Sequence, residues 1–511
     1  PCRPTGPSLS LTRYLDEIKS KAELAKDDQP KQEDKKEKEP RFQIPEGLPG
    51  ADIAPLTIPK FDQNEPLKDR QKKIRDTYSE IPELPPLPFA ENQEGMMSLA
   101  ELQTIAFENS PVLAAAAARV EQARGEAIQA GLYPNPEIAY VGDSINTSDT
   151  QGYNGAGISQ TIVTADKLKI SSSVEWQDVL IAESELRQVK INVATAVREN
   201  YFKALVAQER LKFSRGLVEL FTETYQGQIE LVVGGESAPY EPLQIRVFAV
   251  KAQNDAIVAA NDYVAAWRRL AAVLNAPHLT PHVLEGSPEM PVPQIGYEQA
   301  IETMLSRHTD LSISQTQIQR GELDLWLQQR TPIPNLDLQG EAQLDDTSPL
   351  NDMAFNLRVG FALPIFNKNQ GNIYTAESRL VESHQKLNAA QNQLTADLAE
   401  IYARYTSNRL LAENYRNQII PDQIRTYQST YQRYRQGADT IDFAQIITSL
   451  QQLGQVVGDY VAILGDQWQA VVDLAKILQA DDLYSLGQGI DLPSVPICPP
   501  ETLQVPTPIP E

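Results

Sequence analysis

The sequence predicts a mainly α-helical protein built from two similar halves, each of which contains one β-hairpin. Three observations support this fold class. The range 137–238 contains no proline and 365–492 contains only Pro421, so both stretches can form long helices. The dipeptide Pro134-Asn135 recurs 200 residues later as Pro334-Asn335, which indicates an internal repeat. Each dipeptide is followed by two segments of alternating polar and apolar residues, a pattern typical of strands.

Proline and charge also mark the ends of the structured part. Residues 1–95 contain 14 of the 36 prolines and a run of Lys, Glu, Asp and Gln from Lys31 to Glu39, so we expect a disordered leader there. Seven more prolines from Pro493 onward indicate a disordered tail. The predicted organisation is therefore a leader (1–95), a first repeat (96–292), a second repeat (293–490) and a tail (491–511).

Composition excludes several classes of protein. The chain has 511 residues with 68 acidic side chains against 45 Lys and Arg, a net charge of -23 that disfavours nucleic acid as a partner. No run of 18 apolar residues occurs, so no α-helix is expected to span a bilayer. The two cysteines, Cys2 and Cys498, lie at opposite ends of the chain, which excludes a scaffold held together by several disulfides.

The first element of each repeat is a helix, and the second is a hairpin, predicted over 137–162 and over 336–363. The alternation is clearest in the second hairpin, where about ten residues per strand match the length that crosses a hydrocarbon layer when the strand is tilted. A soluble hairpin that packs one face on a helix accounts for the alternation equally well. The residues expected to face lipid in the first interpretation are Leu336, Leu338, Leu344, Phe355, Leu357, Val359, Phe361 and Leu363.

The third element of each repeat is a helical stretch of about 60 residues, which would be about 90 Å long at 1.5 Å per residue. Leu186, Val189 and Val193 recur at spacings of three and four, which is typical of helices packed side by side in a coiled coil. Four strands cannot close a barrel, and open sheet edges in lipid would leave backbone groups without partners. If the hairpins lie in a membrane, the chain must therefore oligomerise. A soluble coiled-coil scaffold or adaptor protein remains the alternative.

Four short motifs occur in a fixed order in this doubled chain. They are Leu132-Tyr-Pro-Asn-Pro-Glu-Ile138, Gly157-Ile-Ser-Gln-Thr-Ile162, Gly360-Phe-Ala-Leu-Pro-Ile-Phe366 and Tyr434-Arg-Gln-Gly437. Together they resemble the TolC family of outer membrane efflux proteins, and the first motif is most similar to the heavy-metal cation-efflux (Czc-type) branch. The resemblance extends from about Leu99 to about Asp482.

This resemblance implies both a fold and a function. It implies a homotrimer in which four strands per chain form a 12-stranded transmembrane β-barrel in outer membrane lipid, continued by an α-barrel of long helices in the periplasm. It implies the exit duct of a tripartite efflux pump, which conducts passively and has as partners a periplasmic adaptor protein and an inner-membrane transporter of the resistance-nodulation-division type. Metal cations, drugs and proteins all remain open as substrates.

The resemblance also places a closed aperture at the turn that joins the last two long helices. Family members close the helical tube there with rings of polar and charged side chains, and a carboxylate ring would attract cations. Asp439 and Asp442 could equally cap the following helix. The matching first-half turn, from Gly234 to Leu243, is a candidate contact for the adaptor. The candidate aperture residues are Tyr434, Gly437, Asp439, Asp442 and Gln445.

The sequence contains no motif of an enzyme, a cofactor site or a metal site. Gly234-Gly235 is followed by no Lys-Ser or Lys-Thr, as a phosphate-binding loop requires. His278 and His282 are separated by Pro281, which prevents them from lying on one face of a helix as metal ligands often do. We therefore expect no catalysis, no cofactor and no bound metal. Cys2 is a candidate for lipidation, because many relatives are anchored through an N-terminal cysteine.

Overall fold

In the computed structural model the chain divides into two compact units, and all helices and strands described below lie in the second. The first unit is Pro1–Ile58 and the second is Pro59–Glu511. In the first unit the described residues form a short turn, in which the Ala51 N–H donates to the Leu48 carbonyl at 3.0 Å. All elements named below belong to the second unit. The structure describes residues 48–49, 51–54, 56–59, 65–87, 96–145, 152–346, 352–436, 443–480 and 482–483.

Apart from the first helix, the helices and strands follow the same order twice along the chain. The first half contains α2 (Leu67–Thr77), α3 (Leu99–Asn109), α4 (Pro111–Ala130), β1 (Glu137–Asp143), β2 (Tyr153–Ile162), α5 (Lys167–Gly234) and α6 (Glu241–Val273). The second half contains α7 (Tyr297–Arg307), α8 (Thr309–Arg330), β3 (Leu336–Asp345), β4 (Met353–Gly360), α9 (Gln370–Asn414), η2 (Tyr415–Ile419), α10 (Ile420–Arg435) and α11 (Phe443–Ile477). The predicted mainly helical fold with two hairpins is confirmed.

Local sequence signals explain where the short helices begin. At the start of α3, the Ser98 side chain accepts from the Glu101 N–H at 3.3 Å, and the Glu101 carboxylate accepts from the Ser98 N–H at 3.0 Å. This reciprocal capping box satisfies two N–H groups that a helix start would otherwise leave unpaired. The next helix, α4, begins with Pro111, whose missing N–H costs nothing in the first turn.

The long helical stretches have the expected extent. The α5 helix has 68 residues, which corresponds to about 100 Å. In the second half α9, η2 and α10 follow one another without a break, and η2 is a π-helical turn immediately before Pro421. Proline removes one N–H donor and its ring crowds the preceding turn, and a wider π turn is one way in which a helix can continue through such a residue.

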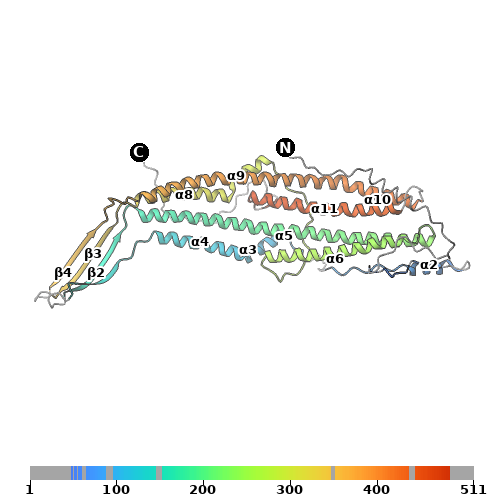
Figure 1. Cartoon of the computed structure of the whole chain (residues 1–511), viewed down its shortest axis with the longest axis horizontal. Coiled ribbons are helices and arrows are strands. Elements are labelled where there is room, and N and C mark those ends of the chain that lie inside the picture. The colour runs from blue at the N-terminus through green and yellow to red at the C-terminus, as the bar shows by residue number, and fades with distance from the viewer. Residues whose placement is uncertain are drawn as a thin grey trace, which may run out of the picture. The chain divides into compact units, whose positions relative to one another are not determined.

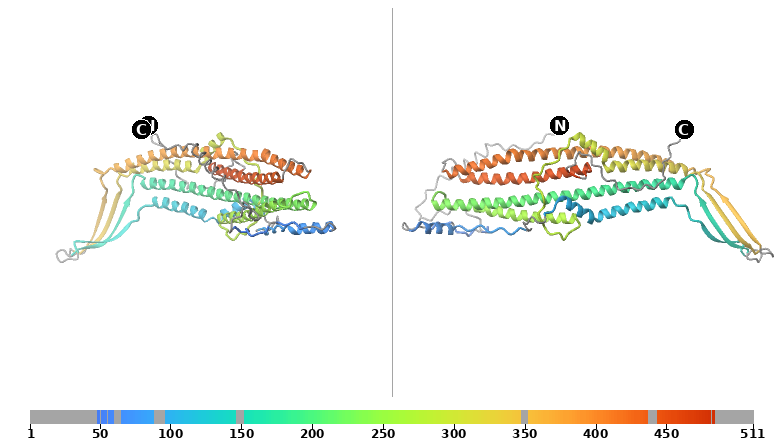
Figure 2. Two further views of the ribbon diagram at one scale, coloured as in Figure 1. Left: turned by 45° about the vertical axis from the view of Figure 1, so that its right-hand side comes forward. Right: turned by 180° about the vertical axis from the view of Figure 1, so that it is seen from behind.

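Within the second unit, short helices stack end to end beside long ones (Figure 1). The α4 and α6 helices pack along α5, and α8 and α11 pack along the stretch from α9 to α10, while α5 also contacts α8 and α11. Figure 2 shows the same side-by-side arrangement from two further directions. The sheet lies at one end of these helices, and the turn between α5 and α6 lies at the other end. The two halves of the chain therefore lie against each other along the length of α5.

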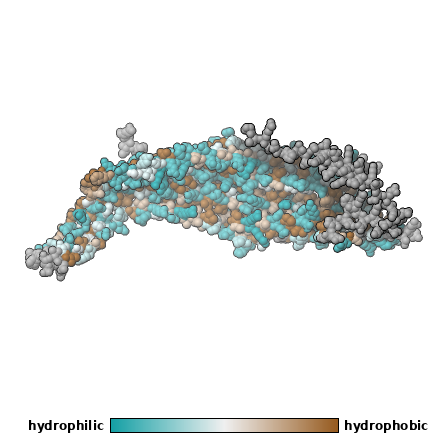
Figure 3. Space-filling view, in the orientation of Figure 1, coloured by the Kyte–Doolittle hydropathy of each residue, from teal (hydrophilic) through white to brown (hydrophobic). Residues whose placement is uncertain are grey.

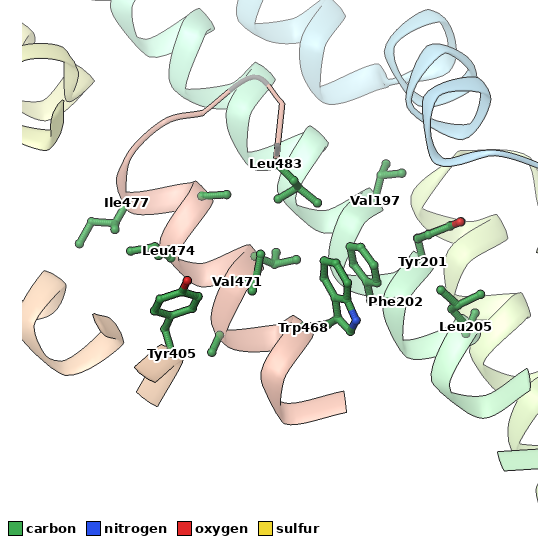
Figure 4. Packing of buried hydrophobic residues seen from close by; sticks show 14 of the residues in the cluster. Val197, Tyr201, Phe202, Leu205, Tyr405, Trp468, Val471, Leu474, Ile477 and Leu483 are labelled. Carbon is green, nitrogen blue, oxygen red and sulfur yellow. The ribbon is translucent and has the colours of Figure 1, made fainter. Parts of the chain in front are cut away.

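The main hydrophobic core lies where these stacked helices meet, away from both ends. Trp468 on α11 stacks on Phe202 of α5 with ring centroids 4.1 Å apart (Figure 4). The indole N–H of Trp468 donates to the Pro288 carbonyl at 2.7 Å, and that of Trp267 donates to the Leu279 carbonyl at 3.0 Å. Aromatic side chains thus fill the core while their polar atoms pair with the proline-rich connection between α6 and α7.

The surface of the helices is predominantly polar on the face shown in Figure 3, and apolar side chains gather where the sheet joins the helices. The exposed apolar residues at this junction include Tyr133, Ile333 and Phe366. Over the described ranges, none of the helices combines the length and the apolarity that crossing a bilayer requires.

Candidate functional site

The two hairpins form one antiparallel sheet in the order β1-β2-β3-β4, and its register divides the side chains between two faces. Directly paired residues of adjacent strands share a face. Ile138 pairs with Ile158, Ile158 with Gly340, and Gly340 with Leu357, so these residues form one apolar row across all four strands. The same face carries Tyr140, Ala156, Leu336, Leu338, Ala342, Leu344, Met353, Phe355 and Val359.

This apolar face is uncovered. Leu357 is 82% exposed and Phe355 is 76% exposed, far above what apolar side chains show in a protein interior. Of the residues expected to face lipid, Leu338 is half-buried, whereas Leu336, Leu344 and Val359 are exposed. Phe361 and Leu363 lie beyond the end of β4 in the connection to α9, and both are exposed. A contiguous apolar surface of this extent requires a covering apolar medium or partner.

The opposite face of the sheet is polar and connected by hydrogen bonds. The Thr161 hydroxyl donates to the Asp337 carboxylate at 2.7 Å, and the Asn356 amide donates to the Gln343 side-chain carbonyl at 3.2 Å. Within the strands this face carries five acidic side chains and only one basic one. They are Glu137, Asp143, Asp337, Glu341 and Asp345, and Arg358. The polar face therefore carries net negative charge.

Both outer edges of the sheet are open. The β1 and β4 strands are the edges, and neither pairs with a further strand among the described residues. Because neighbouring strands are antiparallel throughout, β1 and β4 run in opposite directions. The β4 strand of one copy and the β1 strand of another could therefore continue the antiparallel ladder.

At the far end of the helices, the turn between α5 and α6 lies close to the end of α10. The α5 helix ends at Gly234 and is capped by Gly235, whose φ of +80° is a left-handed conformation that glycine adopts without strain. There the Glu236 N–H donates to the Leu231 carbonyl at 2.9 Å, which closes the helix end. The α6 helix then begins at Glu241. In the second half, Tyr434 near the end of α10 lies beside Phe443 at the start of α11, with ring centroids 6.0 Å apart.

A polar network links the α5–α6 turn to the end of α10. The Tyr434 hydroxyl donates to the Glu241 carboxylate at 3.1 Å and lies 2.9 Å from the Gln228 amide nitrogen. The Gln228 amide nitrogen also lies 2.6 Å from Glu241 and close to Ser237, so its two N–H groups are shared among three acceptors, and the Ser237 hydroxyl donates to Glu241 at 2.5 Å. Glu241 is thus the common acceptor of the network, and among the residues described here Tyr434 is its one donor from the second half of the chain.

Burial keeps Tyr434 in the form that can donate. Removal from water is the main reason that the pKa of Tyr434 is raised, and the negative charge of Glu241 raises it further, while the bond from Gln228 acts in the opposite direction. The phenol therefore keeps its proton at neutral pH. Because the bond joins residues 193 positions apart, it holds the α5–α6 turn against the end of α10.

The other predicted aperture residues are distributed differently. Gln445 is exposed on α11 and lines a groove of about 660 Å³ together with Arg425 and Arg433 of α10. Gly437, Asp439 and Asp442 lie outside the described residues, as does Cys2.

Gln228, Ser237 and Glu241 were not predicted as functional residues. The turn from Gly234 to Leu243 includes Ser237 and Glu241, but the sequence indicates it only as an adaptor contact. Gln228 carries no local signal, since a polar residue on a long polar helix is unremarkable in sequence. Only its burial, at 4% exposure, and its position opposite Tyr434 identify it.

Two of the four histidines make local backbone contacts. His308 precedes α8, and its Nδ1 accepts from the Asp310 N–H at 3.2 Å, so it caps that helix. Burial lowers the pKa of His308, and the nearby Asp310 carboxylate opposes this effect. The Nδ1 of His282 lies 2.6 Å from the Thr280 carbonyl in the connection between α6 and α7. Among the described residues, no group of three or more His, Cys, Asp and Glu side chains is placed to hold a metal ion.

Comparison with known proteins identifies similar chains. A family profile described as outer membrane efflux protein matches residues 102–276 and 300–478. The cobalt-zinc-cadmium resistance protein CzcC of Cupriavidus metallidurans is 22% identical over 396 residues, which cover 76% of this chain and 92% of CzcC. The pyoverdine export outer membrane protein OpmQ of Pseudomonas putida is 24% identical over 415 residues, which cover 74% of this chain and 85% of OpmQ.

The fold is also found among solved structures. A crystal structure of CusC, described in terms of folding and transmembrane channel formation, superposes with a TM-score of 0.62 at 18% identity. The superposition covers 78% of this chain and 98% of CusC. At this identity the likeness concerns the fold, and it extends over both repeats.

Proposed function

This chain belongs to the outer membrane efflux protein family, and we propose that it forms the exit duct of a tripartite efflux pump. The observation that carries the proposal is the two-faced sheet with two open edges. One face is apolar and uncovered, and the other is polar and acidic, which is the division expected of a strand segment between lipid and a water-filled lumen.

The open edges support assembly with copies of the same chain. In a hydrocarbon layer each unpaired backbone group would cost several kcal/mol, so a four-stranded sheet is stable there only when its edges are paired. Pairing β4 of one copy with β1 of the next is a head-to-tail contact that closes into a ring. We propose that three copies close the ring, which makes a 12-stranded barrel in the outer membrane. The helices then extend from the barrel into the periplasm.

The junction between sheet and helices is the proposed boundary between lipid and water. Tyr133, Phe361 and Phe366 are exposed there, immediately outside the strands. Outer membrane barrels carry girdles of aromatic residues at this level, where Tyr in particular combines an apolar ring with a hydroxyl that can bond to water. Because these side chains lie next to the strand ends, their position supports a sheet inserted so deeply that the whole apolar face lies in lipid.

The end of the helices opposite the sheet is the proposed closed aperture. The hydrogen bond between Tyr434 and Glu241 connects the α5–α6 turn of the first half to the end of α10 in the second half. Opening the helical tube requires the pair α5–α6 and the pair α10–α11 to move apart, and this movement breaks the bond. We propose that the adaptor and the inner-membrane transporter of the pump engage this end and that their binding favours the open arrangement.

The acidic lumen face supports cations as the substrate class. Five carboxylates against one guanidinium would raise the local concentration of cations and lower that of anions. The similarity to CzcC, a cobalt-zinc-cadmium resistance protein, agrees with this assignment. We therefore propose metal cation efflux. The duct itself performs no chemistry and conducts passively.

The proposal is tested with the full chain purified in detergent. We expect chemical cross-linking to give a trimer, and we expect reconstitution into planar bilayers to give channels whose reversal potential in a KCl gradient shows cation selectivity. A monomer or dimer that remains soluble without detergent and gives no channels would instead support a coiled-coil scaffold.

A matched pair of substitutions on adjacent residues of β4 tests the orientation of the sheet. Leu357→Lys places a charge on the apolar face, and Asn356→Lys places the same charge on the polar face, opposite Glu341. A lysine that faces hydrocarbon costs about 2–4 kcal/mol at the middle of the bilayer and less near its surfaces. We expect Leu357→Lys to reduce the amount of heat-resistant trimer in the outer membrane fraction and Asn356→Lys to leave it unchanged. Equal amounts for both variants would contradict the assignment of the faces.

A further inference from the structure

Residues 65–87, here called the strap, lie inside the leader that the sequence predicts to be disordered over 1–95. The structure instead describes α2 followed by an extended segment, and both pack on the α5–α6 hairpin. Figures 1 and 2 show α2 beside the end of the helices that carries the α5–α6 turn. Ile74 and Tyr78 are buried in this contact. Two isolated apolar residues in a charged stretch are too few to be recognised as a packing surface from sequence.

Side chains of the hairpin hold the extended part of the strap by its backbone carbonyls. The Tyr225 hydroxyl of α5 donates to the Ser79 carbonyl at 2.8 Å, and the Gln253 amide of α6 donates to the Pro82 carbonyl. Further along, Leu87 packs against the central core. A proline-rich segment has few N–H donors, so carbonyl acceptance is the hydrogen bonding open to it. Side chains of α5 and α6 therefore hold the extended part of the strap through its backbone carbonyls.

Ion pairs contribute little to this contact. Arg75 lies 2.7 Å from Glu230, but the two side chains are 55% and 56% exposed. Exposed pairs of this kind are weakened by water and salt. The strap is therefore held chiefly by the buried side chains and by the hydrogen bonds of the two tyrosines and of Gln253.

The strap reaches the same turn that binds Tyr434. The Tyr78 hydroxyl donates to the carbonyl of Pro239 at 2.9 Å, and Pro239 lies between Ser237 and Glu241. Tyr225, which holds the strap at Ser79, precedes Gln228 by about one turn of α5. The strap thus contacts both the turn that carries Glu241 and the helix segment that carries Gln228.

We propose that the strap is an intramolecular clasp, which packs on α5 and α6 and holds the turn 235–240 in the position that Glu241 needs to bind Tyr434. Release of the strap then frees this turn and favours opening of the proposed aperture. The role in channel opening rests on the function proposed above, whereas the restraint on the turn does not.

The first test measures the restraint itself. We compare amide hydrogen exchange of segment 228–241 in the full chain and in Tyr78→Phe, which removes one hydroxyl and keeps the ring. Loss of one such hydrogen bond should speed exchange there about fivefold. The control is Tyr240→Phe, since Tyr240 is exposed in the same turn and its hydroxyl bonds to no residue that the structure describes. Equal exchange in Tyr78→Phe, Tyr240→Phe and the unchanged chain would overturn the proposal.

The second test measures the coupling to the aperture in planar bilayers. Tyr78→Phe should raise the ratio of open to closed time about fivefold, and Tyr225→Phe should act in the same direction. In a Tyr434→Phe background, Tyr78→Phe should have no further effect, because the contact through which it acts is already lost. Independent, additive effects would overturn the coupling. If the unchanged chain forms no channels, the proposed function fails, and the exchange measurement still decides whether the strap restrains the turn.

Discussion

The bond between Tyr434 and Glu241 offers a direct test of the proposed aperture. Tyr434→Phe removes the hydroxyl that donates to Glu241 at 3.1 Å and accepts from Gln228 at 2.9 Å, while the ring can stay beside Phe443. A hydrogen bond to a charged group contributes about 1.5–3 kcal/mol. Glu241 keeps the donors Ser237 and Gln228, so it is not left unpaired, and the loss should fall near the lower part of this range.

A loss of about 2 kcal/mol per subunit changes the ratio of closed to open states by roughly 30-fold. We therefore expect Tyr434→Phe to raise the mean conductance of single channels in planar bilayers in the absence of any partner. The control is Tyr431→Phe, which removes a phenol hydroxyl one turn earlier on the same helix, where its ring stacks on Tyr427 at 6.1 Å. The reasoning is refuted if Tyr434→Phe conducts like the unchanged protein, or if Tyr431→Phe opens the channel equally.

Two further predictions concern the sheet and the helix cap. At Gly155 an added Cβ would lie 1.9 Å from the Ala342 carbonyl oxygen, whereas at Gly340 its nearest neighbour would be 3.9 Å away. Gly155→Ala should therefore break β2–β3 ladder bonds and lower the apparent Tm of the purified protein in detergent, whereas Gly340→Ala should leave the Tm unchanged. Equal Tm values for the two variants would contradict this close approach. Because burial lowers the pKa of His308 below its unfolded value near 6.5, its contribution to stability is present above about pH 6.5 and declines below it. We expect the apparent Tm to fall more between pH 7.5 and 5.5 in the unchanged chain than in His308→Asn, which keeps a capping acceptor, and an equal fall would exclude His308 as the cause.

The candidate site was only partly predictable from sequence. Tyr434 was identified through the resemblance of its turn to a family motif, but its partner was not, because Glu241 lies 193 residues away. Sequence patterns report on neighbours within a few residues, whereas the contact depends on which helices pack together. The strap was missed for a related reason. Its residues become ordered because Ile74 and Tyr78 are buried against α5–α6. Without that contact, a charged and proline-rich composition indicates disorder.

The local features of this fold were determined by the sequence itself. A period of two places Leu357 and Asn356 on opposite faces whatever the strand pairs with, and the absence of proline permits the 68 residues of α5 to form one helix. The tertiary structure alone decided that β2 pairs with β3, joining the two halves into one sheet with open edges, and that Tyr434 meets Glu241. Such pairings are set by the packing of α5 against α8 and α11, a free energy summed over many distant contacts that no short stretch of sequence contains.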